Sequence, residues 1–378
     1  MKFLHVADLH LDREFEGLKQ KVVYKPYKIL EEITDFSIEE SVDFLVLAGD
    51  NFHQSKPSIK MQNYFIQELK KLETAGITVF LIFGNHDYYR QNTYWFDFPK
   101  NVQVFYSQDI ETKYFQTGNG EKIAVSAFSY LEPHISQNKI KEYPKRDYSV
   151  DYHIGIFHGE LGGSSYAPTT ITDINIKNYD YWALGHIHLQ SNIADNIIYP
   201  GTPIGRNRKE ITSQVALVEL TDTGMKLELV DLSPTHWKNE TIDLSGLSTL
   251  SQVMFEIRQH LEDESNFYSL YFSNYQDIKE QLKEALTSGE LVDSLRAEGK
   301  VIVKTRLLPL EDSNSKHEKI DLPLDALSHL DFYKLAENLP RNIEIQKIIS
   351  EDFLDELESD LSNFIDENFN FQGGSHEN

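Results

Sequence analysis

Residues 43–53 read DFLVLAGDNFH, an apolar run followed by a polar motif, and this combination indicates the fold class. The run DFLVLA lacks polar alternation, as expected of a strand that is covered on both faces. Gly49 permits a sharp turn where the strand ends, and Asp50 and His53 follow that turn. In open α/β sheets, ligand sites form at the carboxyl edge of the strands. The stretch therefore predicts a buried strand that delivers polar side chains to a site.

The same arrangement, an apolar strand followed by a polar motif, recurs along the chain. Helical patterns at Tyr24–Val42 and Ser58–Ala75 separate the first strands. Alternating strands and helices favour a parallel or mixed sheet with helices on its faces. The other motifs are Asp8-Leu9-His10 after Phe3–Ala7, Gly84-Asn85-His86-Asp87 after Thr78–Phe83, His158-Gly159 after His153–Phe157, and Gly185-His186-Ile187-His188 after Tyr181–Leu184. Further strands are expected at Val102–Tyr106, Lys122–Ala127, Val215–Leu220 and Lys226–Val230.

These motifs offer side chains that suit metal ions. Successive strand residues point to opposite sides, so D-x-H and H-x-H can each aim two ligands in one direction. The mixed oxygen and nitrogen set suits Mn²⁺, Fe²⁺ or Zn²⁺ better than Ca²⁺ or Mg²⁺. The chain has no cysteine, which excludes thiolate ligands and disulfides. Seven ligands are more than one ion needs, and two ions sharing a carboxylate would use them all. Together the motifs offer two Asp, one Asn and at least four His side chains as candidate ligands.

Charge and hydropathy bear on the partners. The net charge of −24 argues against a nucleic-acid ligand, because phosphates attract Lys and Arg. Bound divalent cations would reverse the field locally, and no Lys or Arg follows Lys347, so the C-terminal part holds much of the excess. The opening residues do not read as a signal peptide, and no apolar run reaches membrane-spanning length. We therefore expect a cytoplasmic protein without a membrane partner.

The pattern of elements changes after residue 231. We expect a first domain at 1–232 and a small α/β domain at 240–312, with helices at Leu250–Leu261 and Tyr275–Leu286 and strands at Tyr268–Phe272 and Lys300–Arg306. A helical segment follows at 322–368, and 369–378 is expected to be a disordered tail. In the helical segment, apolar residues between Phe353 and Ile365 form a stripe on an acidic helix. This stripe would pack on its own chain or on a partner.

The five motifs, taken in order, resemble the calcineurin-like metallophosphoesterase family. The opening LHVADLHLDREFEGL, the motif GDNFH and Tyr166-Ala167-Pro168 are similar to its DNA-repair branch, which contains SbcD, and within it to bacterial YhaO-like exonucleases. Asp12, where SbcD proper usually has Gly, favours the YhaO-like group. The resemblance covers about residues 1–230. It implies a four-layer α/β sandwich flanked by helices, a small α/β capping domain and C-terminal helices.

The resemblance also implies roles. One metal would be held by Asp8, His10, Asp50 and His188, and the other by Asp50, Asn85, His158 and His186, with Asp50 shared. His86 would stabilise the transition state or protonate the leaving oxygen. Asp87 would orient His86, and His53 would contact a nucleic-acid strand. The implied enzyme is a Mn²⁺-dependent DNA exonuclease that hydrolyses phosphodiester bonds with two metals in DNA repair. Its implied partner is an SbcC-like coiled-coil ATPase, bound through the C-terminal helices, and a homodimer is possible within the family.

Several alternatives stay open. The chain could be a phosphodiesterase for small nucleotides, which its acidity favours, or a non-catalytic metal-binding scaffold subunit. His53 could be an ordinary loop histidine, and His5 is expected to be a packed core residue. Arg206 and Arg208 could touch phosphate or lie in a solvated loop, and the basic stretch Lys139–Arg146 could guide DNA or be solvated.

Overall fold

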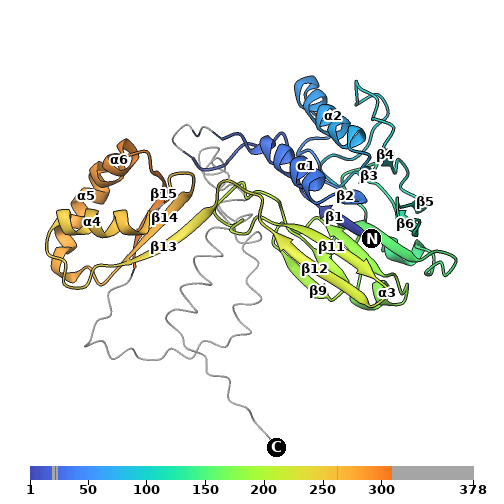
Figure 1. Cartoon of the computed structure of the whole chain (residues 1–378). Coiled ribbons are helices and arrows are strands. Elements are labelled where there is room, and N and C mark those ends of the chain that lie inside the picture. Colours follow the sequence, from blue (N-terminus) through green and yellow to red (C-terminus); the bar gives the residue numbers. More distant parts are fainter. Residues whose placement is uncertain (19–21, 23, 262, 309–378) are drawn as a thin grey trace, which may run out of the picture. The chain divides into compact units, whose positions relative to one another are not determined.

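The structure is a computed structural model, and it describes residues 1–308 without 19–21, 23 and 262. Residues 1–310 form one compact unit. The helical segment expected at 322–368 and the tail expected at 369–378 lie outside the described residues. Within the described part, two large sheets occupy the first 230 residues and a smaller sheet occupies residues 237–307 (Figure 1).

The first sheet has six strands in the order β12-β11-β1-β2-β3-β4. Strands β1 to β4 are parallel, β11 pairs with β1 in antiparallel orientation, and β12 pairs with β11 in antiparallel orientation. The predicted strands of this sheet are confirmed. Their bounds are β1 (Lys2–Val6), β2 (Phe44–Ala48), β3 (Thr78–Ile82), β4 (Val102–Val104), β11 (Val215–Thr221) and β12 (Gly224–Val230).

The second sheet also has six strands, in the order β5-β6-β7-β8-β10-β9. Its central strands β6, β7, β8 and β10 are parallel, and antiparallel β5 and β9 form its edges. Strands β5, β9 and β10 were not predicted. β5 is only half buried, and β9 and β10 are too short to give a clear apolar pattern. The bounds are β5 (Glu111–Gln116), β6 (Lys122–Ala127), β7 (Tyr152–His158), β8 (Tyr181–Gly185), β9 (Ser191–Ala194) and β10 (Ile197–Tyr199).

Strands β1, β2, β3, β7 and β8 bury both faces, which explains their apolar runs. One face of β1 and β2 packs beneath helices α1 (Ile29–Glu39) and α2 (Ile59–Thr74). The other face meets the second sheet in a shared core, where the Phe3 and Phe44 rings stack at 4.7 Å. The outer face of the second sheet is covered by η2 (Lys139–Glu142), α3 (Ile171–Asn175) and loops. The predicted α/β sandwich is therefore confirmed.

Helix α1 is shorter than its predicted range, Tyr24–Val42. A 3-10 turn, η1 (Pro26–Lys28), precedes it. Pro26 begins this turn, because its fixed φ suits the first residue of a helix. The helix ends before Ser41, whose φ of 51° is left-handed. Helix α2 matches its prediction, and the Ser58 hydroxyl caps it by accepting a hydrogen bond from the Met61 amide at 3.2 Å.

The smaller sheet is parallel, in the order β13-β14-β15, and has a core of its own. The predicted helix Tyr275–Leu286 corresponds to η3 and α5. Gly289, with a left-handed φ of 82°, ends α5, and the helix α6 that follows it was not predicted. Strand β13 was not predicted. Only Trp237 and Ile242 in it are buried, so its sequence shows no apolar alternation. The bounds are β13 (Trp237–Asp243), α4 (Leu250–His260), β14 (Phe267–Ser273), η3 (Gln276–Ile278), α5 (Lys279–Ser288), α6 (Glu290–Ala297) and β15 (Val301–Leu307).

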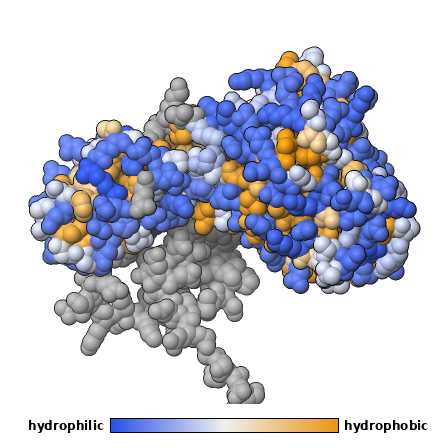
Figure 2. Space-filling model, in the orientation of Figure 1, coloured by the Kyte–Doolittle hydropathy of each residue, from blue (hydrophilic) through white to orange (hydrophobic). Residues whose placement is uncertain are grey.

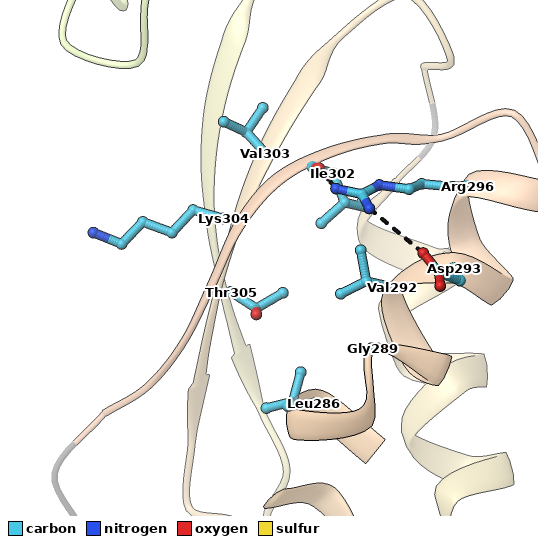
Figure 3. A pocket seen from close by; sticks show the side chains of 9 residues that line it. All are labelled: Leu286, Gly289, Val292, Asp293, Arg296, Ile302, Val303, Lys304 and Thr305. Atoms are coloured by element: carbon cyan, nitrogen blue, oxygen red, sulfur yellow. Dashed lines mark hydrogen bonds and ion pairs between the residues drawn. The ribbon is translucent and has the colours of Figure 1, made fainter. Parts of the chain in front are cut away.

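A pocket of about 290 Å³ lies beside α6 and strand β15 of the smaller sheet (Figure 3). The Arg296 guanidinium crosses it, with Nη1 3.5 Å from Asp293 Oδ1 and Nη2 donating to the Ile302 carbonyl at 2.9 Å. Its volume is at the lower end for small-molecule sites. None of the predicted site residues lines it. The lining residues are Leu286, Gly289, Val292, Asp293, Arg296, Ile302, Val303, Lys304 and Thr305.

Apolar side chains gather on the surface over β11 and β12 (Figure 2). Phe36, Leu217 and Val230 line a pocket of about 170 Å³ there. Strand β12 is an edge of the first sheet and carries exposed Lys226 and Glu228, whose charged groups lie 3.9 Å apart. Charged residues on an edge strand oppose pairing with another chain.

No helix in the described ranges has both the length and the apolar character needed to cross a membrane.

Candidate metal centre

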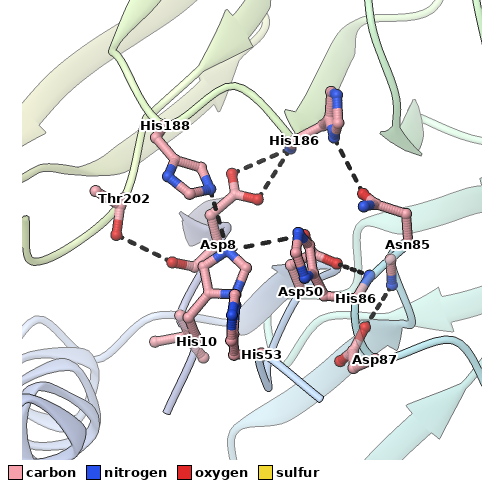
Figure 4. A network of polar contacts seen from close by, with 12 residues as sticks. Asp8, His10, Asp50, His53, Asn85, His86, Asp87, His186, His188 and Thr202 are labelled. Atoms are coloured by element: carbon pink, nitrogen blue, oxygen red, sulfur yellow. Dashed lines mark hydrogen bonds and ion pairs between the residues drawn. The ribbon is translucent and has the colours of Figure 1, made fainter. Parts of the chain in front are cut away.

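The polar motifs meet where strands of both large sheets end (Figure 4). Asp8 and Asp50 follow the adjacent parallel strands β1 and β2, and their loops pair as the strands do. The Asp8 amide donates to the Gly49 carbonyl at 3.2 Å, and the His10 amide donates to the Asp50 carbonyl at 2.9 Å. From the second sheet, His158 ends β7 and His186 follows β8. Two sheets thus contribute to one site.

Four residues of this site have a left-handed backbone conformation. Asp8, His10, Asp50 and His186 have φ values of 53°, 41°, 51° and 100°. Residues other than glycine seldom adopt positive φ, and such strain gathers at active sites. Hydrogen bonds hold it in place, since the His186 amide donates to both Asp8 carboxylate oxygens at 3.0 and 3.1 Å.

One group of ligand atoms comes from Asp8, His10 and His188, whose potential ligand atoms lie within 4.8 Å of one another. His10 Nε2 and His188 Nε2 are 3.0 Å apart. Two imidazole nitrogens at this distance face the same small space, and both can offer lone pairs to one cation. The donor chemistry at this position therefore fits a metal ion.

The second group comes from Asp8, Asp50 and His158, and these residues are buried. Asp50 Oδ2 lies 3.4 Å from His158 Nε2. The Asn85 Oδ1 atom lies 2.9 Å from His158 Nε2 and 3.0 Å from His186 Nδ1. The structure therefore brings the predicted ligands from the loops after β3, β7 and β8 together around one oxygen-rich space.

The two carboxylates lie between the groups. Asp8 belongs to both groups. Asp50 Oδ2 lies 3.8 Å from His10 Nε2 and 3.4 Å from His158 Nε2, so it reaches one nitrogen of each half of the site. The shared role expected of Asp50 stays a prediction, and Asp8 is a second carboxylate placed for it.

Burial and mutual charge perturb these groups. Burial raises the pKa of Asp8 to about 6, against the opposing effect of His158 and His188. The pKa of Asp50 is lowered because His158 and His10 outweigh its desolvation. Conversely, Asp50 overcomes the burial of His158 and raises its pKa to about 9. Burial and the neighbouring His158 lower the pKa of His186 to about 3. Oppositely shifted carboxylates and imidazoles in one pocket are typical of a functional site.

We expect metal binding to release about one proton at pH 7.5. His158, with a pKa near 9, is protonated there in the absence of a cation and must become neutral to bind one. Affinity should therefore fall about tenfold for each pH unit below 9, and more steeply below about 6 as Asp8 protonates. Titration calorimetry of Mn²⁺ in buffers of different ionisation enthalpy measures the release. Binding that is independent of buffer would contradict this assignment of His158.

Glycines leave room for this arrangement. A Cβ at Gly84 would lie 2.2 Å from Asp50 Oδ1 and 2.7 Å from His158 Nε2, and one at Gly185 would lie 2.2 Å from the Ala48 carbonyl oxygen. The motifs G-N-H-D and G-H-x-H thus need glycine because the backbone passes close to ligand atoms.

Gly84→Ala is expected to weaken Mn²⁺ binding at least tenfold and to destabilise the fold by about 1–3 kcal/mol, the usual cost of overpacking. Gly118→Ala is the matched control, since a Cβ there meets nothing within 4 Å. Calorimetry and thermal unfolding would report both effects. Equal metal affinity in the two variants would show that Gly84 does not shape the site.

Comparison with known proteins agrees with this geometry. The sequence model of the calcineurin-like phosphoesterase family matches residues 1–190, half of the chain. The chain belongs to the calcineurin-like phosphoesterase family. Members of this family bind divalent metals, and the Asp and His groups described above match that requirement.

The chain is also similar to individual proteins over part of its length. It is 34% identical over 224 residues to the metallophosphoesterase YhaO of Bacillus subtilis, covering 56% of this chain and 55% of that protein. It is 26% identical over 225 residues to the DNA double-strand break repair protein Mre11 of Methanopyrus kandleri, covering 54% and 49%. With Mre11 of Methanocaldococcus jannaschii it shares 26% over 196 residues, covering 50% and 51%. The chain spans about half the length of these curated relatives.

Two further histidines of this calcineurin-like phosphoesterase lie beside the predicted ligands. His86 and His53 are partly exposed, and their rings stack at 4.7 Å. Both rings meet His10 edge-on, at 5.1 and 5.3 Å. The His86 amide donates to Asp50 Oδ1 at 2.9 Å, which fixes its backbone to the site. The structure places both predicted residues at the rim, while their roles stay predictions.

Asp87 is placed differently from what its predicted role requires. Its Oδ1 accepts from the Gly84 amide at 2.6 Å, and its Oδ2 accepts from the Asn51 amide at 2.8 Å and side chain at 2.9 Å. Both carboxylate oxygens are therefore occupied in holding the loops after β2 and β3 together. Burial and the charge of Asp50 raise the pKa of Asp87 to about 7. Asp87 would act on His86 only through the shape of this loop.

Asp12 and Arg206 hold the first loop, and sequence reasoning found neither role. Asp12 Oδ1 accepts from the His53 amide at 2.5 Å, which links the first two motifs. Arg206 is buried, and its guanidinium donates to the carbonyls of Leu9 at 2.7 Å and His10 at 3.3 Å. Arg206 is thus neither solvated nor at the surface, contrary to both expectations for it. No local pattern distinguishes it from the neighbouring Arg208.

The basic stretch Lys139–Arg146 is also partnered within the chain. Lys139 pairs with Glu142, and the Arg146 guanidinium donates to Asp180 Oδ2 at 3.0 Å. These ion pairs favour a structural role for both cations. His5 is a packed core residue, as expected, and its Nδ1 lies 3.0 Å from the Tyr181 hydroxyl.

Proposed function

We propose that this chain is a Mn²⁺-dependent phosphodiesterase that hydrolyses DNA from its ends. The observation that carries this proposal is the convergence of oxygen and nitrogen ligands from both large sheets, with the His86 ring at the rim. A set of Asp, Asn and His ligands suits two divalent ions, and Mn²⁺ favours such mixed ligands. The relatives that match about half of the chain include DNA double-strand break repair proteins, which supports DNA as substrate.

The chain's own residues have separable tasks in this reaction. Asp8, His10, Asp50 and His188 would hold one cation, and Asp50, Asn85, His158 and His186 the other. Cations held by these residues would supply Lewis acidity at the phosphoryl group and an activated water. His86, partly exposed beside them, is placed to donate a hydrogen bond to the phosphate or a proton to the leaving oxygen. His53, stacked on it, would contact the nucleic-acid strand.

A phosphodiesterase for small nucleotides is the second candidate, and the net charge of −24 favours it. A polyanion is repelled over its whole length by an acidic surface, whereas a small nucleotide presents few phosphates. The DNA proposal therefore predicts that excess acidity lies away from the path of the strand. It also predicts a cleavage rate that changes strongly with salt.

The deciding experiment compares substrates on one preparation. End-labelled linear DNA and cyclic mononucleotides are incubated with the full chain and Mn²⁺, with EDTA as control. Shortening of the labelled DNA that EDTA abolishes supports the proposal. Hydrolysis of cyclic nucleotides without any attack on DNA would favour the second candidate. Tight Mn²⁺ uptake without hydrolysis of either substrate would favour a scaffold subunit instead.

We further propose that an SbcC-like coiled-coil ATPase binds the apolar stripe between Phe353 and Ile365 and directs the nuclease, acting in the cytoplasm. The sequence predicts an acidic helix with an apolar face there, and such a face suits helix-to-helix docking. This segment lies outside the described residues. The labelled-DNA assay with and without the candidate ATPase tests the pairing, and an unchanged rate together with no co-elution would refute it.

A further inference from the structure

A buried carboxylate outside the five motifs contacts one of the predicted metal ligands on the side that faces away from the site. Glu210 is 7% exposed and lies in the loop between β10 and β11. Its Oε1 atom lies 2.9 Å from Nδ1 of His188. His188 directs its other ring nitrogen, Nε2, toward His10 at 3.0 Å. Glu210 therefore holds the outer side of an imidazole whose inner side faces the site.

The loop is folded around this carboxylate. Glu210 Oε2 accepts from the Arg206 amide at 2.6 Å, and Oε1 also accepts from Asn207 Nδ2 at 3.2 Å and from Arg13 Nη1 at 3.4 Å. Four donors thus converge on one side chain, counting His188. Such a carboxylate is oriented by its surroundings and cannot rotate away without leaving buried donors unpaired.

The same loop is anchored at several other points. Gly205 donates its amide to Ser213 Oγ at 3.1 Å, and its carbonyl accepts from the Trp237 indole at 2.9 Å. A Cβ at Gly205 would lie 2.1 Å from the Glu210 carbonyl oxygen, so the turn requires glycine. The Thr202 amide donates to the His188 carbonyl at 2.9 Å. Glu210 is therefore presented by a rigid support that also contacts the His188 backbone.

The hydrogen bond determines which ring nitrogen carries the proton. A carboxylate accepts but does not donate, so the bond at 2.9 Å requires a proton on His188 Nδ1. In the neutral ring, Nε2 then carries the lone pair, and it faces His10 Nε2 at 3.0 Å. An imidazole that donates to a carboxylate is also a more basic ligand. Glu210 thus favours the tautomer and the ring orientation that binding through Nε2 needs.

The other histidines of the site are supported differently. His158 donates from Nδ1 to the Ala48 carbonyl at 2.9 Å, which directs its Nε2 inward. His10 Nδ1 is buried without a hydrogen-bond partner in the described part of the chain. Among the described contacts of the predicted ligands, Glu210 is the carboxylate that binds the outer nitrogen of a histidine. Loss of Glu210 should therefore act selectively on the half of the site that contains His188.

We propose that Glu210 is a positioning residue that sets the tautomer and orientation of His188, and through it the affinity for one of the two cations. This inference rests on the proposed two-metal function. It assigns no direct ligation to Glu210, because its carboxylate contacts the ring nitrogen that points away from the site.

The test is Mn²⁺ titration calorimetry on the full chain after EDTA treatment. The wild type should bind two ions. Glu210→Ala should weaken one of the two binding events by about 10- to 100-fold, the usual effect of removing an outer partner of a metal ligand, and change the other less than about threefold. Glu210→Gln keeps an acceptor atom without the charge and should show a smaller loss at the same site. Electron paramagnetic resonance of the spin-coupled Mn²⁺ pair should weaken in the same order at stoichiometric loading.

Glu16→Ala is the matched control. Glu16 also binds Arg13, with Oε1 2.7 Å from Arg13 Nε, but it is half exposed and has no described contact with a predicted ligand. Its removal should leave both Mn²⁺ affinities within about twofold. Thermal unfolding of the EDTA-treated variants separates support of the fold from support of the metal.

The outcomes separate a failure of the Glu210 assignment from a failure of the proposed two-metal function. Wild-type protein that binds no Mn²⁺ overturns the proposed function and this assignment with it. Wild-type protein that binds two ions, with Glu210→Ala less stable but unchanged in both affinities, overturns the role of Glu210 alone. If Glu210→Ala does not fold, Glu210→Gln decides by the same criterion. An equal loss at both sites would also refute the selective role.

Discussion

Replacing Asp50 by Asn is expected to reduce Mn²⁺-dependent phosphodiester hydrolysis by about 10³-fold or more. Asp50 Oδ2 lies within 4 Å of nitrogens from His10 and His158, and its loss removes negative charge from between the two halves of the site. Bound cations contribute several kcal/mol of transition-state stabilisation, and each 1.36 kcal/mol is a factor of about ten in rate. Asn keeps the shape and an oxygen that can accept from the His86 amide. The loss would therefore reflect charge rather than a collapsed loop.

The measurement is steady-state hydrolysis of bis-p-nitrophenyl phosphate, combined with Mn²⁺ titration. Asp43→Asn is the matched control at the other end of the same strand, where Asp43 Oδ2 accepts from the Lys2 amide at 2.7 Å. The control should keep its rate within about threefold. Activity near the wild-type level in Asp50→Asn would overturn the two-metal site.

His86→Gln is expected to lower kcat by about 10²- to 10⁴-fold while leaving Mn²⁺ affinity nearly unchanged, the usual range for loss of a general acid or base. His86 is excluded from both groups of ligand atoms, yet its ring meets His10 at 5.1 Å and is partly exposed to an incoming substrate. It is therefore placed to act on the phosphate rather than on the cations.

A substrate with a better leaving group sharpens this test. If His86 protonates the leaving oxygen, the variant should recover much of its rate on a p-nitrophenyl ester, whose leaving group needs no proton. If it only stabilises charge on the phosphate, the loss should be similar for both substrates. His260→Gln, on α4, is the control and should behave as the wild type. A His86 variant with unchanged kcat on DNA would remove it from the mechanism.

Some elements were predictable because local pattern and tertiary environment agree in them. Strands β2 and β3 are buried on both faces, so every residue except Thr78 is apolar and the pattern is clear. Helix α2 combines apolar periodicity with a serine cap. Where the environment is mixed, the pattern fails: β5 is only half buried, and β13 buries little beyond Trp237 and Ile242. In such strands, pairing with neighbours decides the conformation.

The candidate ligands were predictable for a related reason. Each follows a strand end, and parallel strands bring their carboxyl ends to one edge, so separate motifs must converge there. This argument reaches Asp8 and Asp50 on the first sheet, and His158 and His186 on the second. It does not reach Asp87, whose carboxylate serves the loops rather than the His86 ring.

The kinds of candidate ligand, their order along the chain and their positions at strand ends follow from the sequence alone, because they depend on short segments whose chemistry is local. The side chains that hold the candidate ligands and their loops in place are seen only in the folded protein. Arg206 reaches the Leu9 carbonyl across 197 positions of sequence, and Glu210 meets His188 across 22. The reason is physical: a hydrogen bond between distant loops leaves no periodicity in the chain, and it exists only after two sheets have packed and brought those loops together.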